Sequence, residues 1–318
     1  MGAVATSISL ILLYVGIATA FVSIALVAGA SSPLLLTIGA VAACLALPFV
    51  VTSISFTLAW IFRTRRPPAC TIGPVASVRT YVGEALAIAR SHPRMAIGYW
   101  AMRDPAPRRA ATPVLLLHGV LCNAGMWRGT IRRLAAAGCG PVYTMTYGPP
   151  TASIEHFADQ LAAKIDAMRA ATGAARVSLV GHSMGGVVAR AYLRRYGGAT
   201  VRCLVTVGAP HHGSVHAWMF FGECLAQIRP GNAWLAALNA DVDPPPTRIV
   251  SLWSWHDSMV APQASAELPG ADNVEFTGIG HNALVDHPAI VARVVFELLR
   301  AEHASRVEPA GQSELLAR

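Results

Sequence analysis

Hydrophobic and polar positions follow three patterns along this chain, and the first is almost continuously apolar. Residues 1–62 contain no Asp, Glu, Lys or Arg. Two blocks, Ile8–Ala30 and Pro33–Phe62, are each long enough for a helix to cross about 30 Å of bilayer hydrocarbon at about 1.5 Å per residue. The pattern predicts a transmembrane hairpin, which we assign to residues 1–66.

Single residues refine the hairpin. Pro48 is expected to kink the second span, and Trp60 suits an interfacial anchor. Three arginines follow that span in "RTRRPP", and the positive-inside tendency places them in the cytoplasm. We therefore expect a multi-pass protein of a bacterial-type inner membrane with a cytoplasmic catalytic domain. A cleaved signal peptide is the alternative, because Ala28–Ala30 has the small-x-small form, although the amino end lacks positive charge.

The second pattern is a connector over residues 67–95. Apolar residues recur there at helical spacing, namely Val75, Val78, Val82, Leu86 and Ala89. This amphipathic helix has two possible partners, the membrane surface or the domain that follows. We expect it to pack on the domain, because it is neither strongly basic nor rich in large aromatic residues.

The third pattern, over residues 96–302, alternates short apolar runs with helical stretches. The expected strands are "IGYWAM", "VLLLHG", "VYTMTY", "VSLVGH", "RCLVTVG", "RIVSLWS" and "NVEFTGIG". Amphipathic helices are expected between them, among them 154–171 and 184–196. The alternation predicts an α/β fold with a mainly parallel sheet covered by helices on both faces. The polar tail, 303–318, is expected to fray.

Composition adds membrane attachment and gives no sign of nucleic-acid binding. The chain is 54% hydrophobic and 13% charged, with a mean hydropathy of +0.47, which is typical of a membrane-attached globular protein. The net charge of +8 comes from scattered arginines without interleaved aromatic residues, so a solvated surface is favoured over a nucleic-acid or anionic-lipid site. The six cysteines show no metal-binding spacing and are expected to be buried free thiols rather than disulfides.

The segment "SLVGHSMGG" carries the candidate nucleophile, Ser183. A serine between an apolar strand and a helix sits on a sharp turn that exposes its hydroxyl, and Gly181 and Gly185 leave room for the tight backbone. A lone G-x-S-x-G motif is weak, because glycine turns with serine are common. The strand-turn-helix context makes the nucleophile the favoured interpretation.

A serine nucleophile needs a base and an acid that orients the base. Asp257 follows the expected strand "RIVSLWS", and His281 follows the last one in a glycine-rich loop. Asp257 has an alternative role as a helix cap. The rival acids and bases are Asp241, Asp243, Asp286, His256 and His287, whose positions relative to the strands fit less well.

Acyl transfer also needs donors for the oxyanion, usually backbone N–H groups. We expect one from Met184, the residue after the nucleophile, and one from Val120 in the loop after "VLLLHG". Two other histidine sites receive structural interpretations. The adjacent histidines of "GAPHHGS" are expected to pack the loop rather than bind metal, and His182 to hold the turn.

Six blocks in order resemble the α/β-hydrolase superfamily, and within it bacterial triacylglycerol lipases and esterases. They are "VLLLHGVLCNAGMW", "VSLVGHSMGGVVARAYL", "VTVGAPHHGS", "RPGNAWLAALN", "HDSMVAPQASAELPGA" and "GIGHNALV". The resemblance covers about 97–299 and not the hairpin. It implies the triad Ser183, Asp257 and His281, and ester hydrolysis without a metal or organic cofactor.

The expected function is therefore cleavage of carboxylic esters, with lipid-like substrates favoured by membrane attachment. An insertion near 214–245 carries large apolar residues that would form a cap beside Ser183 or pack in the core. A membrane-bound acyltransferase with the same triad and a non-catalytic membrane scaffold stay open as alternatives. The oligomeric state is not indicated by the sequence.

Overall fold

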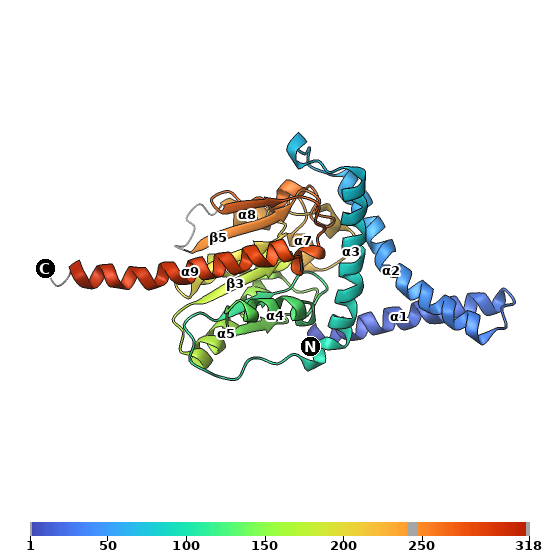
Figure 1. Ribbon diagram of the computed structural model, residues 1–318, viewed down its shortest axis with the longest axis horizontal. Coiled ribbons are helices and arrows are strands. Elements are labelled where there is room, and N and C mark those ends of the chain that lie inside the picture. Colours follow the sequence, from blue (N-terminus) through green and yellow to red (C-terminus); the bar gives the residue numbers. More distant parts are fainter. Residues whose placement is uncertain (1, 241–246, 316–318) are drawn as a thin grey trace.

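The computed structural model describes residues 2–240 and 247–315, and within them a parallel sheet forms the centre of the molecule (Figure 1). Six strands pair in the order β2-β1-β3-β4-β5-β6, all parallel. Their bounds are β1 Val114–Leu117, β2 Val142–Met145, β3 Val177–His182, β4 Val201–Val207, β5 Arg248–Ser254 and β6 Asp272–Phe276. The predicted α/β fold is confirmed, and the order reverses direction at β1, beside β3.

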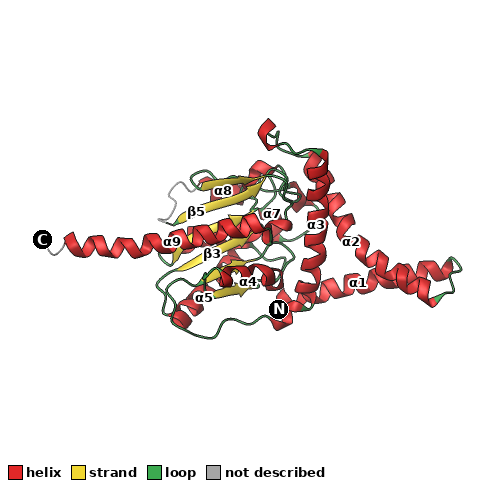
Figure 2. Ribbon diagram, in the orientation of Figure 1, coloured by secondary structure: helices red, strands yellow, loops and turns green. Residues whose placement is uncertain are grey.

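Helices cover both faces of the sheet (Figure 2). Successive residues of β1 show why: Leu115 packs with α5 (Ile154–Thr172) and α6 (Met184–Tyr196), and Leu116 packs on the opposite face with α4 (Arg128–Ala136) and α9 (Pro288–Leu315). Side chains alternate between the faces of a strand, so a strand buried on both faces is apolar throughout. This explains the unbroken "VLLL" run.

The first two helices lie largely outside this core. α1 (Gly2–Val27) and α2 (Pro33–Ile61) contact each other, and their segments Val4–Val27 and Pro33–Ile61 are long and apolar enough to cross a membrane. Hardly any of either segment is buried in the protein. Ser32 caps α2 through its side chain, and Pro48 lies inside this helix as expected.

The connector helix α3 (Pro74–Ala96) packs on the α/β domain, but through a different face from the one predicted. Its valine positions point outward, with Val75 65% and Val78 62% exposed. The buried face carries Thr80, Glu84 and Ile88, among others. Helical periodicity located the apolar stripe correctly and the packing surface wrongly, because hydrogen bonds made by Glu84 bring the other face inward.

Two further segments differ from the sequence interpretation. The expected strand "IGYWAM" contains a 3₁₀ turn, η2 (Gly98–Ala101), and the Trp100 indole N–H donates to Ala96 O at the end of α3. Short apolar runs do not distinguish strand from helix, and here the run follows α3 directly as a 3₁₀ turn. The tail, expected to fray, continues α9 as helix to Leu315.

Short helices of the expected insertion complete the fold. They are η4 (Val215–Trp218), α7 (Glu223–Gln227) and α8 (Ala233–Ala240). Leu225 is buried and Trp234 packs against the same core cluster as Met184, whereas the aromatic residues from Trp218 to Phe221 are exposed. The insertion thus divides between core packing and an exposed apolar loop. Asp241 and Asp243 lie outside the described residues.

Candidate active site

Ser183 occupies a strained turn between β3 and α6. Its φ of 55° lies in the left-handed region, which L side chains rarely adopt. The turn is held because the Ser183 N–H donates to Val207 O at the end of β4 and its carbonyl accepts from Gly186 N. Backbone strain kept by its surroundings is a common property of functional residues, and this geometry presents the serine beyond the sheet edge.

The two glycines beside Ser183 are required by space. A Cβ on Gly181 would lie 2.6 Å from Gly186 N, and one on Gly185 would lie 2.5 Å from Leu117 O. Backbone atoms on both sides therefore block any side chain. The spacing of the G-x-S-x-G motif follows from the close packing of β3, α6 and β1.

Asp257 and His281 form a buried hydrogen-bonded pair. The loops after β5 and β6 carry them, and His281 Nδ1 donates to Asp257 Oδ2 over 2.8 Å, with both side chains at least 96% buried. Asp257 Oδ1 accepts from the backbone N–H groups of Met259 and Val260. Both roles considered for Asp257 therefore apply: Oδ1 caps the backbone that follows, and Oδ2 holds the imidazole of His281.

A glycine after β4 leaves room for this pair. Gly208 has a φ of +56°, and a Cβ there would lie 3.1 Å from Asp257 Oδ2 and 3.3 Å from His281 Nδ1. Glycine adopts such φ values without the steric cost that other residues incur. The "VTVGAP" segment therefore has a defined part in seating the acid and the base.

Electrostatics favour a protonatable His281. Burial lowers the pKa of His281, but the Asp257 carboxylate, through its charge and its hydrogen bond, and the more distant Glu84 together raise that pKa above its ordinary value. An imidazole whose protonated form is stabilised in this way accepts a proton readily. The pair has the chemistry of a general base with its orienting acid.

His182 contacts His281 through its ring and through a hydrogen bond to the backbone. Its Nε2 lies 3.1 Å from His281 O, and the two rings are 4.6 Å apart between centroids. Burial, together with the neighbouring His281, lowers the pKa of His182 well below the ordinary histidine value. The neutral ring then donates Nε2–H to the carbonyl oxygen, in line with the expected structural role of this residue.

The loop after β1 lies directly against the nucleophile. A Cβ on Gly119 would be 2.9 Å from Ser183 Cβ, so this position admits only glycine. Val120 follows it, and Leu121 has a φ of 55°, which turns the chain sharply. Met184 is the first residue of α6, where the N–H has no acceptor within the helix. Val120 thus follows a glycine that lies against Ser183, and Met184 is the residue after Ser183.

The rival residues have other partners. Asp286 forms an ion pair with Arg94 of α3 at 2.7 Å, and His256 Nδ1 accepts from Gly278 N. His287 Nδ1 accepts from Ala289 N. His211 of "GAPHHGS" lies in the core within hydrogen-bonding distance of Thr206 Oγ1. Within residues 2–240 and 247–315, no group of three or more His, Cys, Asp or Glu is placed to hold a metal ion.

Sequence reasoning missed Glu84. This residue of α3 is fully buried, and its carboxylate accepts hydrogen bonds from the two loops that carry Asp257 and His281. One signal was present in the sequence: Glu84 is the only acidic residue between Pro74 and Ala96. The apolar stripe of α3 does not point to Glu84, because this stripe is not the face that packs on the domain.

A cavity of about 260 Å³ lies beside the acid loop. Its walls come from α2, α3 and the loop after β5, and they include Phe56, Trp60, Tyr81, His256 and Asp257. Aromatic side chains of the second apolar helix therefore border the same loop that carries the catalytic acid candidate. The hairpin and the site are physically adjacent.

Comparison with known proteins agrees with the α/β fold and finds similarity to lipases. Residues 112–252 match the family model of the alpha/beta hydrolase fold. Over 59 residues the chain is 42% identical to triacylglycerol lipases of Pseudarthrobacter phenanthrenivorans and Burkholderia plantarii, a stretch that is 19% of this chain and 18% and 16% of those lipases. The match thus spans less than a fifth of either relative.

Solved structures of lipases share the fold. A mature Bacillus licheniformis lipase superposes with a TM-score of 0.54 at 19% identity, over 62% of this chain and 96% of its own. Aspergillus fumigatus lipase B superposes with a TM-score of 0.56 at 15% identity, over 80% of each chain. At these identities the likeness concerns the fold alone.

Proposed function

Because this chain carries an α/β-hydrolase domain similar to those of lipases and esterases, we propose that it hydrolyses carboxylic esters through a Ser183–His281–Asp257 triad. The observation that carries the proposal is the buried Asp257–His281 pair, in which His281 contacts His182, the residue before the strained Ser183. In parallel sheets, ligands bind at the carboxyl ends of the strands, near the point where strand order reverses. Here that point lies between β1 and β3.

In the first step Ser183 Oγ attacks the ester carbonyl and His281 takes the serine proton. Asp257 stabilises the imidazolium and holds the ring in place. The proton then passes to the departing alcohol, leaving an acyl-serine. In the second step His281 deprotonates a water molecule, which attacks the acyl-serine; the acid is released and the proton returns from His281 to Ser183 Oγ.

The oxyanion of both steps would be held by the backbone N–H groups of Met184 and Val120. Removal of one such donor costs about 10²–10³ in kcat in a characterised serine hydrolase. Both residues lie on fixed backbone, at the start of α6 and in the loop pressed against Ser183. Such groups need little reorganisation as charge develops.

Lipid-like esters at a membrane are the substrate class we favour. The apolar surfaces of α1 and α2 are exposed, as are the valines of α3 and the loop Trp218–Phe221. Large exposed apolar surface typically marks contact with a membrane or a partner. Two spans, with Arg63, Arg65 and Arg66 after the second, would leave the hydrolase domain in the cytoplasm.

Hydrolysis of short-chain p-nitrophenyl esters tests the proposal. The Ser183→Ala variant should lose activity by at least about 10³-fold, because its nucleophile is gone. Ser91→Ala is a matched control, since Ser91 Oγ donates only to Ile88 O within α3, and it should retain activity. Unchanged turnover by folded Ser183→Ala would refute the triad. Product analysis with added alcohols separates hydrolysis from acyl transfer.

A further inference from the structure

α3 reaches the catalytic loops through one buried carboxylate. Glu84 Oε1 accepts hydrogen bonds from Ser258 Oγ at 2.7 Å and from Asn282 N and Nδ2 at 2.9 Å, and Oε2 accepts from Ala283 N at 2.9 Å. An ionised carboxylate accepts and does not donate, so four donors match it completely. Buried charges occur where they are compensated in this way.

The donors belong to both catalytic loops. Ser258 follows Asp257, and Asn282 and Ala283 follow His281. The Ser258 hydroxyl also accepts from the His281 backbone N–H at 3.4 Å. Glu84 is thus hydrogen-bonded to the residue after the acid and to the two residues after the base.

Gly280 makes the close approach possible. A Cβ at that position would lie 2.5 Å from Glu84 Oε2, where the carboxylate already stands. The glycine before His281 is therefore explained by Glu84. The two residues are 196 positions apart, so the fit between α3 and this loop is a tertiary feature rather than a local turn requirement.

We propose that Glu84 is a positioning residue for the catalytic pair, by which α3 holds the loops of Asp257 and His281 in register. The inference rests on the proposed function. α3 follows α2 in the chain and stands between the hairpin and the sheet (Figure 1), so the seating of this membrane-proximal helix becomes a condition for an aligned triad. Small displacements of catalytic groups lower rates strongly, by about 10²-fold for about 1 Å.

The charge of Glu84 also acts on His281. Four titratable groups face this imidazole: Asp257 from the acid loop, Glu84 from α3, His182 from the end of β3 and His216 from η4. The two carboxylates favour the imidazolium, and the two histidines, when protonated, would oppose it. Replacing Glu84 by glutamine removes one favourable charge and should lower the pKa of His281.

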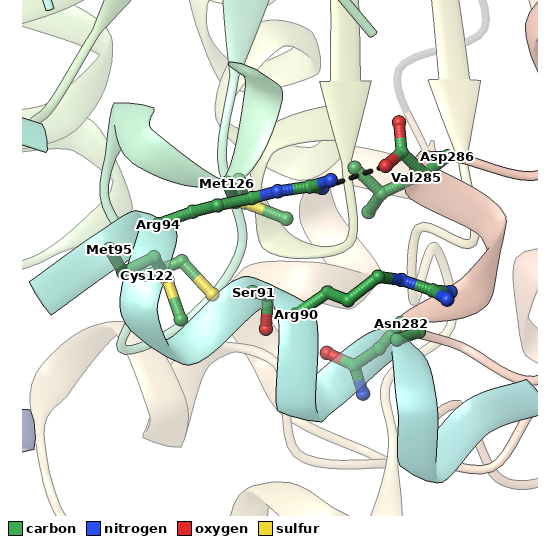
Figure 3. A pocket seen from close by; sticks show the side chains of 10 residues that line it. Arg90, Ser91, Arg94, Met95, Cys122, Met126, Asn282, Val285 and Asp286 are labelled. Carbon is green, nitrogen blue, oxygen red and sulfur yellow. Dashed lines mark hydrogen bonds and ion pairs between the residues drawn. The ribbon is translucent and has the colours of Figure 1, made fainter. Parts of the chain in front are cut away.

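A second link between α3 and the same region provides a control. Arg94 pairs with Asp286 at the other end of the loop, beside Asn282 and Arg90 (Figure 3). Arg94→Gln breaks a tether of α3 without touching Glu84 or His281. If α3 contributes only to stability, Glu84→Gln and Arg94→Gln should have similar effects on the site. If Glu84 positions the catalytic pair, only Glu84→Gln should change the His281 pKa and the reactivity of Ser183.

The test measures the His281 pKa by NMR in the full-length protein in lipid nanodiscs, with histidines isotopically labelled and His281 assigned from a His281→Asn spectrum. We expect Glu84→Gln to lower the His281 pKa and Arg94→Gln to leave it unchanged. Equal His281 pKa values in Glu84→Gln and wild type would overturn the inference. This readout needs no substrate, so it holds even where wild type fails to cleave esters and the proposed function falls.

Labelling by a fluorophosphonate probe gives the functional arm. Glu84→Gln should react at least about tenfold more slowly than wild type, while Arg94→Gln should stay within about twofold. If Glu84→Gln does not fold, Ser258→Ala removes one of the four hydrogen bonds to Glu84, together with the longer contact from the His281 backbone N–H, and keeps the charge. It should lower the labelling rate severalfold without moving the His281 pKa. A wild-type rate in Ser258→Ala would contradict the positioning role.

Discussion

The hairpin and the α/β domain are both rich in leucine, but the leucines lie in opposite surroundings. Leu34 of α2 is 69% exposed, whereas Leu116 of β1 is fully buried. The domain covers its apolar side chains with its own helices, and the hairpin leaves them uncovered. Since burial of apolar surface drives folding in water, the uncovered helices are suited to a lipid surrounding.

Polar residues differ as sharply between the two regions. The hairpin contains no Asp, Glu, Lys, Arg or His through Phe62. The domain, with α3, buries Glu84, Asp257, His281 and Glu297, each with hydrogen-bonding partners. α3 shares features of both regions, because its valines face outward and its carboxylate is hydrogen-bonded to the loops that carry Asp257 and His281.

The largest expected difference between the two regions is the loss of unfolding free energy when a leucine is replaced by alanine. Leu116→Ala leaves a cavity between packed layers and should destabilise the domain by about 2–5 kcal/mol. Leu34→Ala, in the exposed hairpin, should change the unfolding free energy of the domain by less than about 0.5 kcal/mol. Urea denaturation in detergent, followed by tryptophan fluorescence, measures both. Equal losses would break the distinction between covered and uncovered leucines.

A charge in the hairpin tests its relation to the membrane. Leu45→Arg places a cation near the middle of α2, where insertion into a bilayer costs about 2.5–3.5 kcal/mol. We expect a clear fall in the fraction of protein that resists carbonate extraction. The hydrolase domain should stay folded, as limited proteolysis would show. Full retention in the membrane would contradict the assignment of α2 as a span.

The free energy of unfolding should decrease as the pH is lowered, because histidines of the α/β domain are protonated. Burial lowers the pKa values of His118 and His256 to about 4, below their value of about 6.5 in the unfolded chain. As pH falls below about 6.5 the unfolded state takes up protons first, so folding weakens until about pH 4. For these two groups together we expect a loss of about 3 kcal/mol between pH 6.5 and 5.

The raised pKa of His281 acts in the opposite direction, just above pH 6.5, and partly offsets this trend. Thermal unfolding across the pH range measures the sum. The hairpin contributes no histidine or carboxylate to it. A Tm that stays constant from pH 6.5 to 5 would contradict neutral buried histidines.

Local patterns predicted much of the fold and the site. Strand runs and the G-x-S-x-G turn predicted Ser183 as the candidate nucleophile, and the order of later loops predicted Asp257 and His281 as its partners, because the end of a strand can be recognised from local sequence. The role of Glu84 was hidden, since its partners Ser258 and Asn282 lie 174 and 198 residues away. Periodicity likewise identifies the apolar face of α3 but not which face the tertiary structure covers.

One measurement tests the central claim most directly: fluorophosphonate labelling of the full-length protein, followed by mapping of the modified residue by mass spectrometry. The account predicts one label for each chain on Ser183, and loss of this label in His281→Asn, because the hydroxyl then lacks its base. A folded wild-type protein that takes no label, or takes it on another serine, would contradict the proposed triad.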